Sequence, residues 1–157
     1  MRTWSIPRAI LVGGLIAGIL DITFAISFGI YNGLTPERLL QIVASGLLGK
    51  EAFTGGTATA AVGLLCHFAL SLVWMTLFLL AARQSPGLAA RPLVSAIGYG
   101  IVVFLAMRLV VLPLSAFPRP VTFKPLATVM DLASHIFLFG LPIVWATRKA
   151  IYIGGKK

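Results

Sequence analysis

Residues 9–31 read AILVGGLIAGILDITFAISFGIY, and this stretch decides the fold class. Only Asp21 carries a charge in it. About 20 apolar residues are enough for a helix to cross the roughly 30 Å hydrocarbon core of a bilayer. A basic start before an apolar run is also typical of a secretory signal peptide. This run, however, is longer than the apolar region of a signal peptide, and no obvious small-residue cleavage site follows it. We therefore expect it to be retained as the first span.

Three more apolar runs follow, at residues 58–82, 92–112 and 126–147. The composition agrees with membrane insertion, since 59% of the residues are hydrophobic and only 11% are charged, whereas soluble domains carry about 25% charged residues. The mean hydropathy is +0.99. We predict an all-α integral membrane protein with four transmembrane helices in a bundle, forming one domain over residues 1–157.

A shorter helix is predicted between the first two spans, at residues 36–49. Thr35 is a typical N-cap, a proline follows it, and Glu37 suits the first helical turn. Glu37, Gln41 and Ser45 form a polar stripe on an otherwise apolar helix. Its length of about 20 Å is too short for the bilayer core. We expect an amphipathic helix that is either interfacial or re-entrant.

Proline interrupts the chain near the last two spans. Four prolines between residues 113 and 125 forbid a regular helix there, and we expect an extended cap over the bundle. Pro142 lies inside the fourth apolar run and is expected to kink its last turns.

The basic residues lie mostly at the ends of the apolar runs. Four spans place both termini on one side, and the basic residues of that side are Arg2, Arg8, Arg83, Arg91, Arg148, Lys149, Lys156 and Lys157. The other side has Arg38, Lys50, Arg119, Lys124 and, near the boundary, Arg108. By the positive-inside rule we expect both termini in the cytoplasm. The same rule explains the net charge of +9, so no nucleic-acid partner is expected.

Five ionisable side chains lie inside the predicted spans, namely Asp21, His67, Arg108, Asp131 and His135. Such groups are costly in hydrocarbon and face protein or water. Counted from the outer span ends, Asp21, His67 and His135 lie about 15 Å deep along their helices. Arg108 and Asp131 are nearer the outer surface. We predict that all five form a ligand- or proton-binding site in the outer half, above an apolar inner half.

Structural pairs are the alternative explanation of the same residues. Asp131 and His135 are four residues apart on one helix face and can hydrogen-bond. Arg108 and Asp131 form either an ion pair between spans or an anion site in which Arg108 binds the ligand. Asp21 and His67 form either an interhelical hydrogen bond or a proton-titrating pair.

Small residues share faces with these polar groups. Gly63, His67 and Ser71 are spaced at four residues and lie on one helix face. Gly14 and Gly18 form a GxxxG spacing, which lets two helix backbones approach closely. We expect these faces to point into the bundle.

Cofactor chemistry is a further alternative. His67 and His135 lie at one depth on two spans and can serve as axial ligands of a b-type haem. With Asp21 they are also acceptable metal ligands, although no local spacing such as HExxH supports this. Cys66 is interpreted as a small buried residue. We predict no catalytic residue, and no cofactor unless it is haem or a metal.

Residues 44–68, ASGLLGKEAFTGGTATAAVGLLCHF, together with VLPLS at 111–115 and GLP at 140–142, resemble a small family of uncharacterised bacterial membrane proteins with four expected spans. The resemblance covers nearly the whole chain. It implies a bacterial inner-membrane location and assigns no activity.

Our first functional hypothesis is binding or transport of a small solute or ion, coupled to protonation at Asp21, His67 or His135. An accessory or scaffold subunit of a larger membrane complex and a haem- or metal-binding membrane protein are the alternatives. Four short spans leave little room for a path through one chain, and GxxxG faces favour helix contacts. We therefore expect a homo-oligomer in the lipid bilayer, with a dimer as the first guess.

Overall fold

The computed structural model describes residues 4–151, and every regular element in that range is helical. Four helical stretches are long and apolar enough to cross a membrane: Ile6–Tyr31, Gly56–Gln84, Pro92–Leu114 and Pro125–Ala150. This confirms the prediction that the described chain is all-helical with four helices of membrane-spanning length and apolarity, which suggest a multi-pass membrane protein. Arg2, Lys156 and Lys157, which entered the topology argument, lie outside the described residues.

Each span is longer than the apolar run that predicted it. The first span, α1 (Ile6–Tyr31), begins after Ser5, whose hydroxyl accepts a hydrogen bond from the backbone N–H of Arg8. The second, α3 (Gly56–Gln84), continues past Arg83. The remaining spans consist of several segments. Their bounds are α5 (Pro92–Ala106), a π-helical segment (Met107–Val111) and α6 (Leu112–Leu114), then α7 (Pro125–Ser134), a π-helical segment (His135–Gly140) and α8 (Leu141–Ala150).

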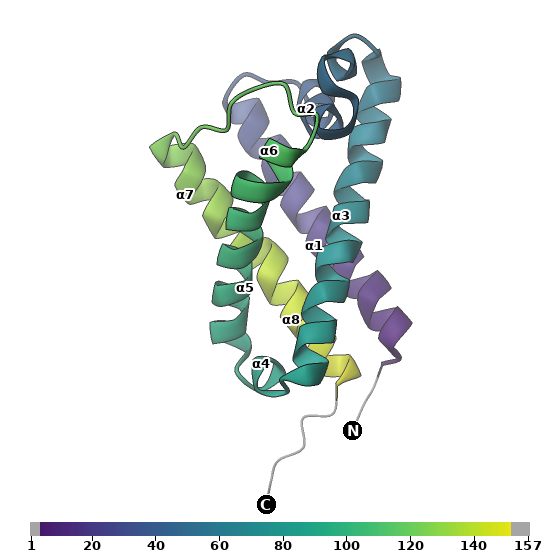
Figure 1. Ribbon diagram of the computed structural model, residues 1–157, viewed down its shortest axis with the longest axis vertical. Coiled ribbons are helices and arrows are strands. Elements are labelled where there is room, and N and C mark those ends of the chain that lie inside the picture. Colours follow the sequence, from purple (N-terminus) through teal and green to yellow (C-terminus); the bar gives the residue numbers. More distant parts are fainter. Residues whose placement is uncertain (1–3, 152–157) are drawn as a thin grey trace, which may run out of the picture.

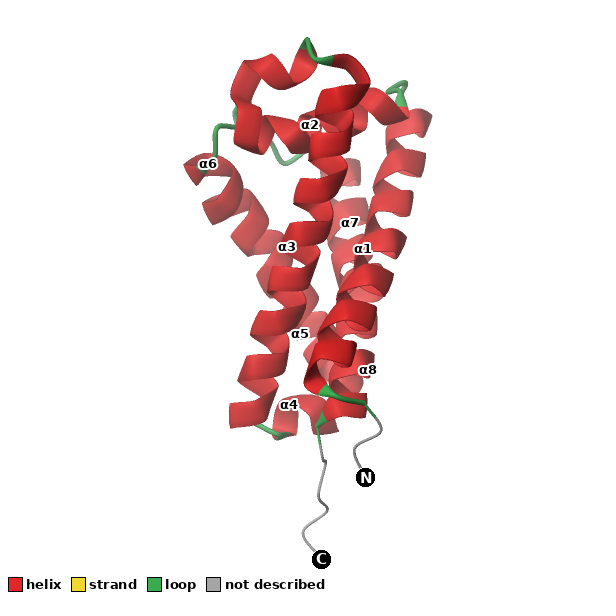
Figure 2. Ribbon diagram, turned by 90° about the vertical axis from the view of Figure 1, so that its right-hand side faces the viewer, coloured by secondary structure: helices red, strands yellow, loops and turns green. Residues whose placement is uncertain are grey.

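The two ends of the molecule differ in what they carry (Figure 1). One end, which we call the termini end, holds the start of α1, the end of α8 and the short helix α4 (Gly87–Ala90) that joins α3 to α5. The opposite loop end holds α2 (Pro36–Leu48), a 3-10 segment (Gly49–Phe53) and the loop that follows α6. Figure 2 shows the same division from the side. The four spans thus bring the start of α1 and the end of α8 to one end of the molecule.

The apolar core lies in the half of the molecule nearer the termini. Helix α1 packs against α3 and α8, and α5 packs against the last span. The core side chains come from all four spans and are nearly or fully buried: Ala9, Ala17, Met75, Phe78, Leu79, Ala82, Ala96, Val103, Phe139, Ile143, Val144, Ala146 and Ala150. An apolar inner half was predicted from the sequence, and the packing agrees with it.

Each of the last two spans contains a wide π-helical turn just before a proline. Met107–Val111 precedes Pro113, and His135–Gly140 precedes Pro142. Proline has no N–H for the usual helical bond, and its ring clashes with the carbonyl four residues earlier, so the preceding turn widens. The third span therefore runs through Pro113 to Leu114, two residues beyond the predicted end. The irregularity expected after Pro142 lies instead in the turn before it.

The proline-rich stretch is not helical between residues 115 and 124, as predicted. It crosses the loop end and is fastened to α2, because the backbone N–H of Ala116 donates to the carbonyl oxygen of Gly46 at 2.9 Å.

Helix α2 turns two residues of its polar stripe towards the protein, whereas the third, Glu37, is exposed at the start of the helix. Gln41 and Ser45 are buried, and the Gln41 side-chain amide donates to the carbonyl oxygen of Gly56 at the start of α3 (3.2 Å). Leu47, on the opposite side, is 65% exposed. The polar groups are satisfied within the protein, and apolar side chains face outwards, as suits a lipid environment.

Substituting Gly63 by alanine is expected to destabilise the protein. The added Cβ would lie 1.9 Å from the carbonyl oxygen of Leu40, so α2 would have to move away from α3. Overpacking of this kind costs about 1–3 kcal/mol of unfolding free energy. Circular dichroism during denaturation in detergent measures it. Gly98→Ala is the matched control, because nothing lies within 4 Å of its added Cβ; equal losses in both variants would contradict the contact.

Candidate functional site

The contact between α1 and α3 is built on the GxxxG glycines. The hydroxyl of Ser71 donates to the carbonyl oxygen of Gly14 at 2.7 Å, and Nε2 of His67 lies 2.9 Å from the carbonyl oxygen of Gly18. A carbonyl only accepts, so this ring nitrogen of His67 carries a proton. A Cβ at Gly18 would lie 2.9 Å from the ring of Phe68. The small residues thus let α1 and α3 approach closely enough for Ser71 and His67 to reach backbone carbonyl oxygens of α1.

Asp21 and His67 are not bonded to each other, in contrast to the predicted interhelical hydrogen bond. Asp21 instead accepts a hydrogen bond from the hydroxyl of Ser134 on α7, at 2.5 Å. Asp21 faces the last span, whereas Gly18, one turn earlier, faces α3. His67 is therefore satisfied by the α1 backbone, and the acid joins helices α1 and α7.

Arg108 and Asp131 form the ion pair that was one of the two interpretations of these residues. Nη2 and Nε of Arg108 donate to Oδ2 of Asp131 at 2.8 and 3.1 Å, and Nη1 donates to the carbonyl oxygen of Thr122 at 2.7 Å. The guanidinium also lies over the rings of Phe104 and Phe123, 5.2 and 5.3 Å from their centroids. The guanidinium nitrogens already donate to acceptors of the same chain, and two aromatic rings lie against its face. This favours the ion pair over an open anion site.

His135 contacts the carboxylate and the backbone of Asp131. Its Nδ1 is 3.2 Å from Oδ1 of Asp131 and 2.8 Å from the carbonyl oxygen of the same residue, which confirms the predicted contact along the helix. The carboxylate of Asp21 also interacts electrostatically with His135. Because Nδ1 faces acceptors only, it carries a proton, and Nε2 is the atom that can take a second one.

We refer to Asp21, Arg108, Asp131, Ser134 and His135 as the polar cluster. It connects α1 with the two π-helical spans. The side chains of His135 and Arg108 are 14% and 18% exposed, and that of Asp131 is 36% exposed. Asp131 is therefore the most accessible of these three side chains to solvent or to a solute.

The charges of the polar cluster do not balance when His135 is neutral. The cluster contains two carboxyl groups, of which Asp131 pairs with Arg108 and Asp21 bonds Ser134, so with both carboxyl groups ionised the formal charges sum to one negative charge. A proton on His135 or a bound monovalent cation would neutralise it. In a low-dielectric region an uncompensated charge is costly, so the arrangement is suited to binding one positive charge.

The structure does not bring the residues of the metal-site alternative together. No group of three or more His, Cys, Asp or Glu side chains suited to a metal ion occurs within residues 4–151. His67 and His135 each have one ring nitrogen at a backbone carbonyl. A b-type haem between them stays a prediction. Cys66 is a free, half-buried thiol.

Sequence reasoning missed several members of the site. Ser134 precedes His135 in the sequence, and a polar residue beside an intramembrane histidine was a signal that could have identified it. Thr122 accepts a hydrogen bond from Arg108 at its backbone carbonyl oxygen, and nothing in the sequence pattern pointed to this residue. Gly100 was also missed; a Cβ there would lie 2.6 Å from the carbonyl oxygen of His135, so it lets α5 approach the cluster.

No family model matches the sequence, and no curated protein or solved structure matches it significantly. The resemblance to a family of bacterial membrane proteins therefore stays a prediction. The site is interpreted from its own geometry.

A double-mutant cycle on Arg108 and Asp131 measures their coupling. Arg108→Gln and Asp131→Asn each leave a partner charge uncompensated. Each is expected to lower the unfolding free energy by about 1–3 kcal/mol, between the values for exposed and buried pairs. The double variant should lose less than the sum of the two, measured by denaturation in detergent. Arg83→Gln, which removes an exposed arginine at the termini end, is the control, and additive losses would contradict the pairing.

Two substitutions separate hydrogen bonding by His67 from any other role. His67→Ala removes the donor to the Gly18 carbonyl and is expected to cost about 1 kcal/mol or more of unfolding free energy. His67→Gln supplies an amide donor and should recover part of this loss. Denaturation of both variants in detergent is the measurement, and equal stability of the two would rule out a structural hydrogen bond.

Proposed function

We propose that this chain is a multi-pass protein of the bacterial inner membrane that binds a small solute or ion at the polar cluster and carries it across the bilayer, coupled to protonation. The observation that supports this most is the contact of His135 with Asp131, next to Ser134, which bonds Asp21. Ionisable residues inside membranes are costly and commonly mark ion pathways and proton relays.

The charge of the site favours a positive ligand. The cluster has one carboxylate more than Arg108 can compensate. A proton at Nε2 of His135 would neutralise this extra negative charge. A monovalent cation, or a small cationic solute, competes for the same charge. Proton release and ligand binding would then be coupled because both depend on the same negative charge.

An unpaired hydroxyl beside the ion pair adds support for a bound ligand. The Thr128 hydroxyl oxygen is buried and has no hydrogen-bond partner within residues 4–151. Thr128 lies one helical turn before Asp131, so a water or solute at Asp131 would be able to satisfy it. Buried polar groups are normally paired, and exceptions occur at functional sites.

The two π-helical segments give the site a means of rearrangement. They contain Arg108 and His135, and each precedes a proline. Wide turns of this kind are frequent at functional sites, and interrupted helices are typical of transporter binding sites. A change in either turn would rotate Arg108 or His135 relative to the apolar core at the termini end. Such a rotation is needed if the site is to open to the opposite side of the membrane.

The orientation in the membrane belongs to the same proposal. The basic residues favour the termini end in the cytoplasm, so the loop end and the exposed side of Asp131 face the periplasm. Helix α2 is then interfacial, with Gln41 and Ser45 on the protein and apolar side chains towards lipid. A homodimer completes the proposal, because one chain of four spans provides little room for a solute path.

Flux through liposomes tests the transport proposal. Purified protein is reconstituted, a gradient of pH or of a monovalent cation is imposed, and the change inside is followed with a fluorescent indicator. Wild-type protein is expected to show pH-dependent flux. His135→Gln and Asp21→Asn should reduce it to the rate of protein-free liposomes, because the proton-binding atom or the compensating charge is lost.

His67→Gln is the matched control, since this histidine bonds the α1 backbone outside the polar cluster. It should retain flux. If no tested ion moves, or if His135→Gln keeps the wild-type rate, the transport proposal fails. Absence of flux together with co-purification of a fixed partner would support the scaffold alternative, and a haem absorbance band would support the cofactor alternative.

A further inference from the structure

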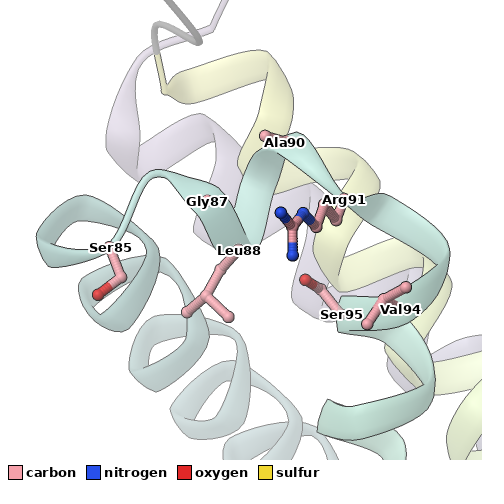
Figure 3. A pocket seen from close by; sticks show the side chains of 7 residues that line it. All are labelled: Ser85, Gly87, Leu88, Ala90, Arg91, Val94 and Ser95. Carbon is pink, nitrogen blue, oxygen red and sulfur yellow. The ribbon is translucent and has the colours of Figure 1, made fainter.

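A pocket at the termini end lies apart from the polar cluster (Figure 3). It has a volume of about 560 Å³ and is formed where α4 joins the end of α3 to the start of α5. Its lining residues are Ser85, Gly87, Leu88, Ala90, Arg91, Val94 and Ser95. A volume of this size lies in the range of small-ligand sites.

Two polar side chains of the pocket have no partner in the part of the chain that the structure describes. Ser95 is only 8% exposed, and its hydroxyl makes no side-chain hydrogen bond within residues 4–151. The guanidinium of Arg91 likewise has no carboxylate or hydrogen-bond partner there. Figure 3 shows Arg91, Ser95 and Leu88 among the side chains that line the pocket. A hydroxyl on a nearly buried residue and an exposed cation share this pocket without protein partners, which suits a ligand that accepts hydrogen bonds.

The chain has no acidic side chain that could pair with Arg91. The sequence contains only 4 acidic residues. Asp21 and Asp131 belong to the polar cluster, and Glu37 and Glu51 lie at the loop end. The termini end, by contrast, carries several basic residues besides Arg91: Arg8, Arg83, Arg148 and Lys149. No acidic side chain of residues 4–151 therefore lies at this end to pair with Arg91.

The start of α5 adds hydrogen-bond donors to the same place. Arg91 is the N-cap of this 15-residue helix, and its carbonyl oxygen accepts from the N–H of Ser95. The N–H groups of Leu93 and Val94, in the first turn, have no acceptor within the helix. Free N–H groups and the helix dipole favour a phosphate at such an end.

The rest of the pocket is apolar and continues onto the outer face of α5. Leu88, Ala90 and Val94 line it. Val94 is 68% exposed and Ile97, one turn further into the span, is 45% exposed. A ligand with a phosphate at one end and a hydrocarbon chain at the other would contact Arg91 and this apolar strip together.

We propose that this pocket binds an anionic phospholipid. The lipid phosphate accepts hydrogen bonds from the guanidinium of Arg91 and the hydroxyl of Ser95, and one acyl chain lies against Leu88, Val94 and Ile97. The site is independent of solute binding at the polar cluster, because no residue belongs to both. It anchors the α3–α5 connection to the lipid headgroups.

Lipid titration of the purified full chain in detergent, followed by native mass spectrometry, tests this proposal. The probes are phosphatidylglycerol, phosphatidylcholine and inorganic phosphate. Arg91→Gln is expected to weaken phosphatidylglycerol binding about tenfold, as the loss of one charge-assisted hydrogen bond does. Ser95→Ala should weaken it less. Arg83→Gln, which removes the same charge at the same end but outside the pocket, should leave binding unchanged.

Three results would overturn the assignment. Equal weakening by Arg83→Gln and Arg91→Gln would indicate diffuse attraction to the basic end. Equal binding of phosphatidylcholine and phosphatidylglycerol would show that the lipid charge is not recognised. Displacement of the lipid by inorganic phosphate would make the site one for a soluble anion. Circular dichroism checks the fold of each variant, and Ser95→Ala gives a second reading of the site if Arg91→Gln is unfolded.

Discussion

The close contact of α1 with α3 is the constraint on which the rest of the structure depends. Lipid provides no hydrophobic drive for helix association, so van der Waals contact and interhelical hydrogen bonds must hold spans together. Gly14 and Gly18 allow the approach, and their carbonyl oxygens accept bonds from Ser71 and His67. This contact fixes the rotation of α1 about its axis. Asp21 is consequently directed at the last span, where it meets Ser134.

The polar cluster depends equally on the irregular turns of the last two spans. Prolines 113 and 142 each lie just after a π-helical segment, and these segments carry Arg108 and His135. Polar groups in a low-dielectric interior must be satisfied as a network, since each unpaired member is costly. Arg108, Asp131 and His135 meet this condition through one another. The one negative charge that they leave with Asp21 is the feature that suits the cluster to a proton or a cation.

The four spans could be predicted because each follows from composition along a continuous run. The contact of Asp131 with His135 was equally predictable, since residues four apart on one helix always lie close. The partner of Asp21 was not. Depth along a helix can be counted from the sequence, but the rotation of one helix against another cannot, and His67 and Ser134 lie on different neighbours of α1. The orientation of α2 was open for the same reason, because an amphipathic pattern does not say which face meets the protein.

The sequence by itself determined an all-helical membrane protein with four spans, and it marked Asp21, His67, Arg108, Asp131 and His135 as exceptions in an apolar chain. These properties are local, because hydropathy and helical periodicity are set by neighbouring residues. Only the tertiary structure separated His67, bonded to the α1 backbone, from the four that share the polar cluster. It alone also showed Arg91 and Ser95 without partners at the termini end. Both results depend on which helix faces meet, and that is decided by packing of the whole chain.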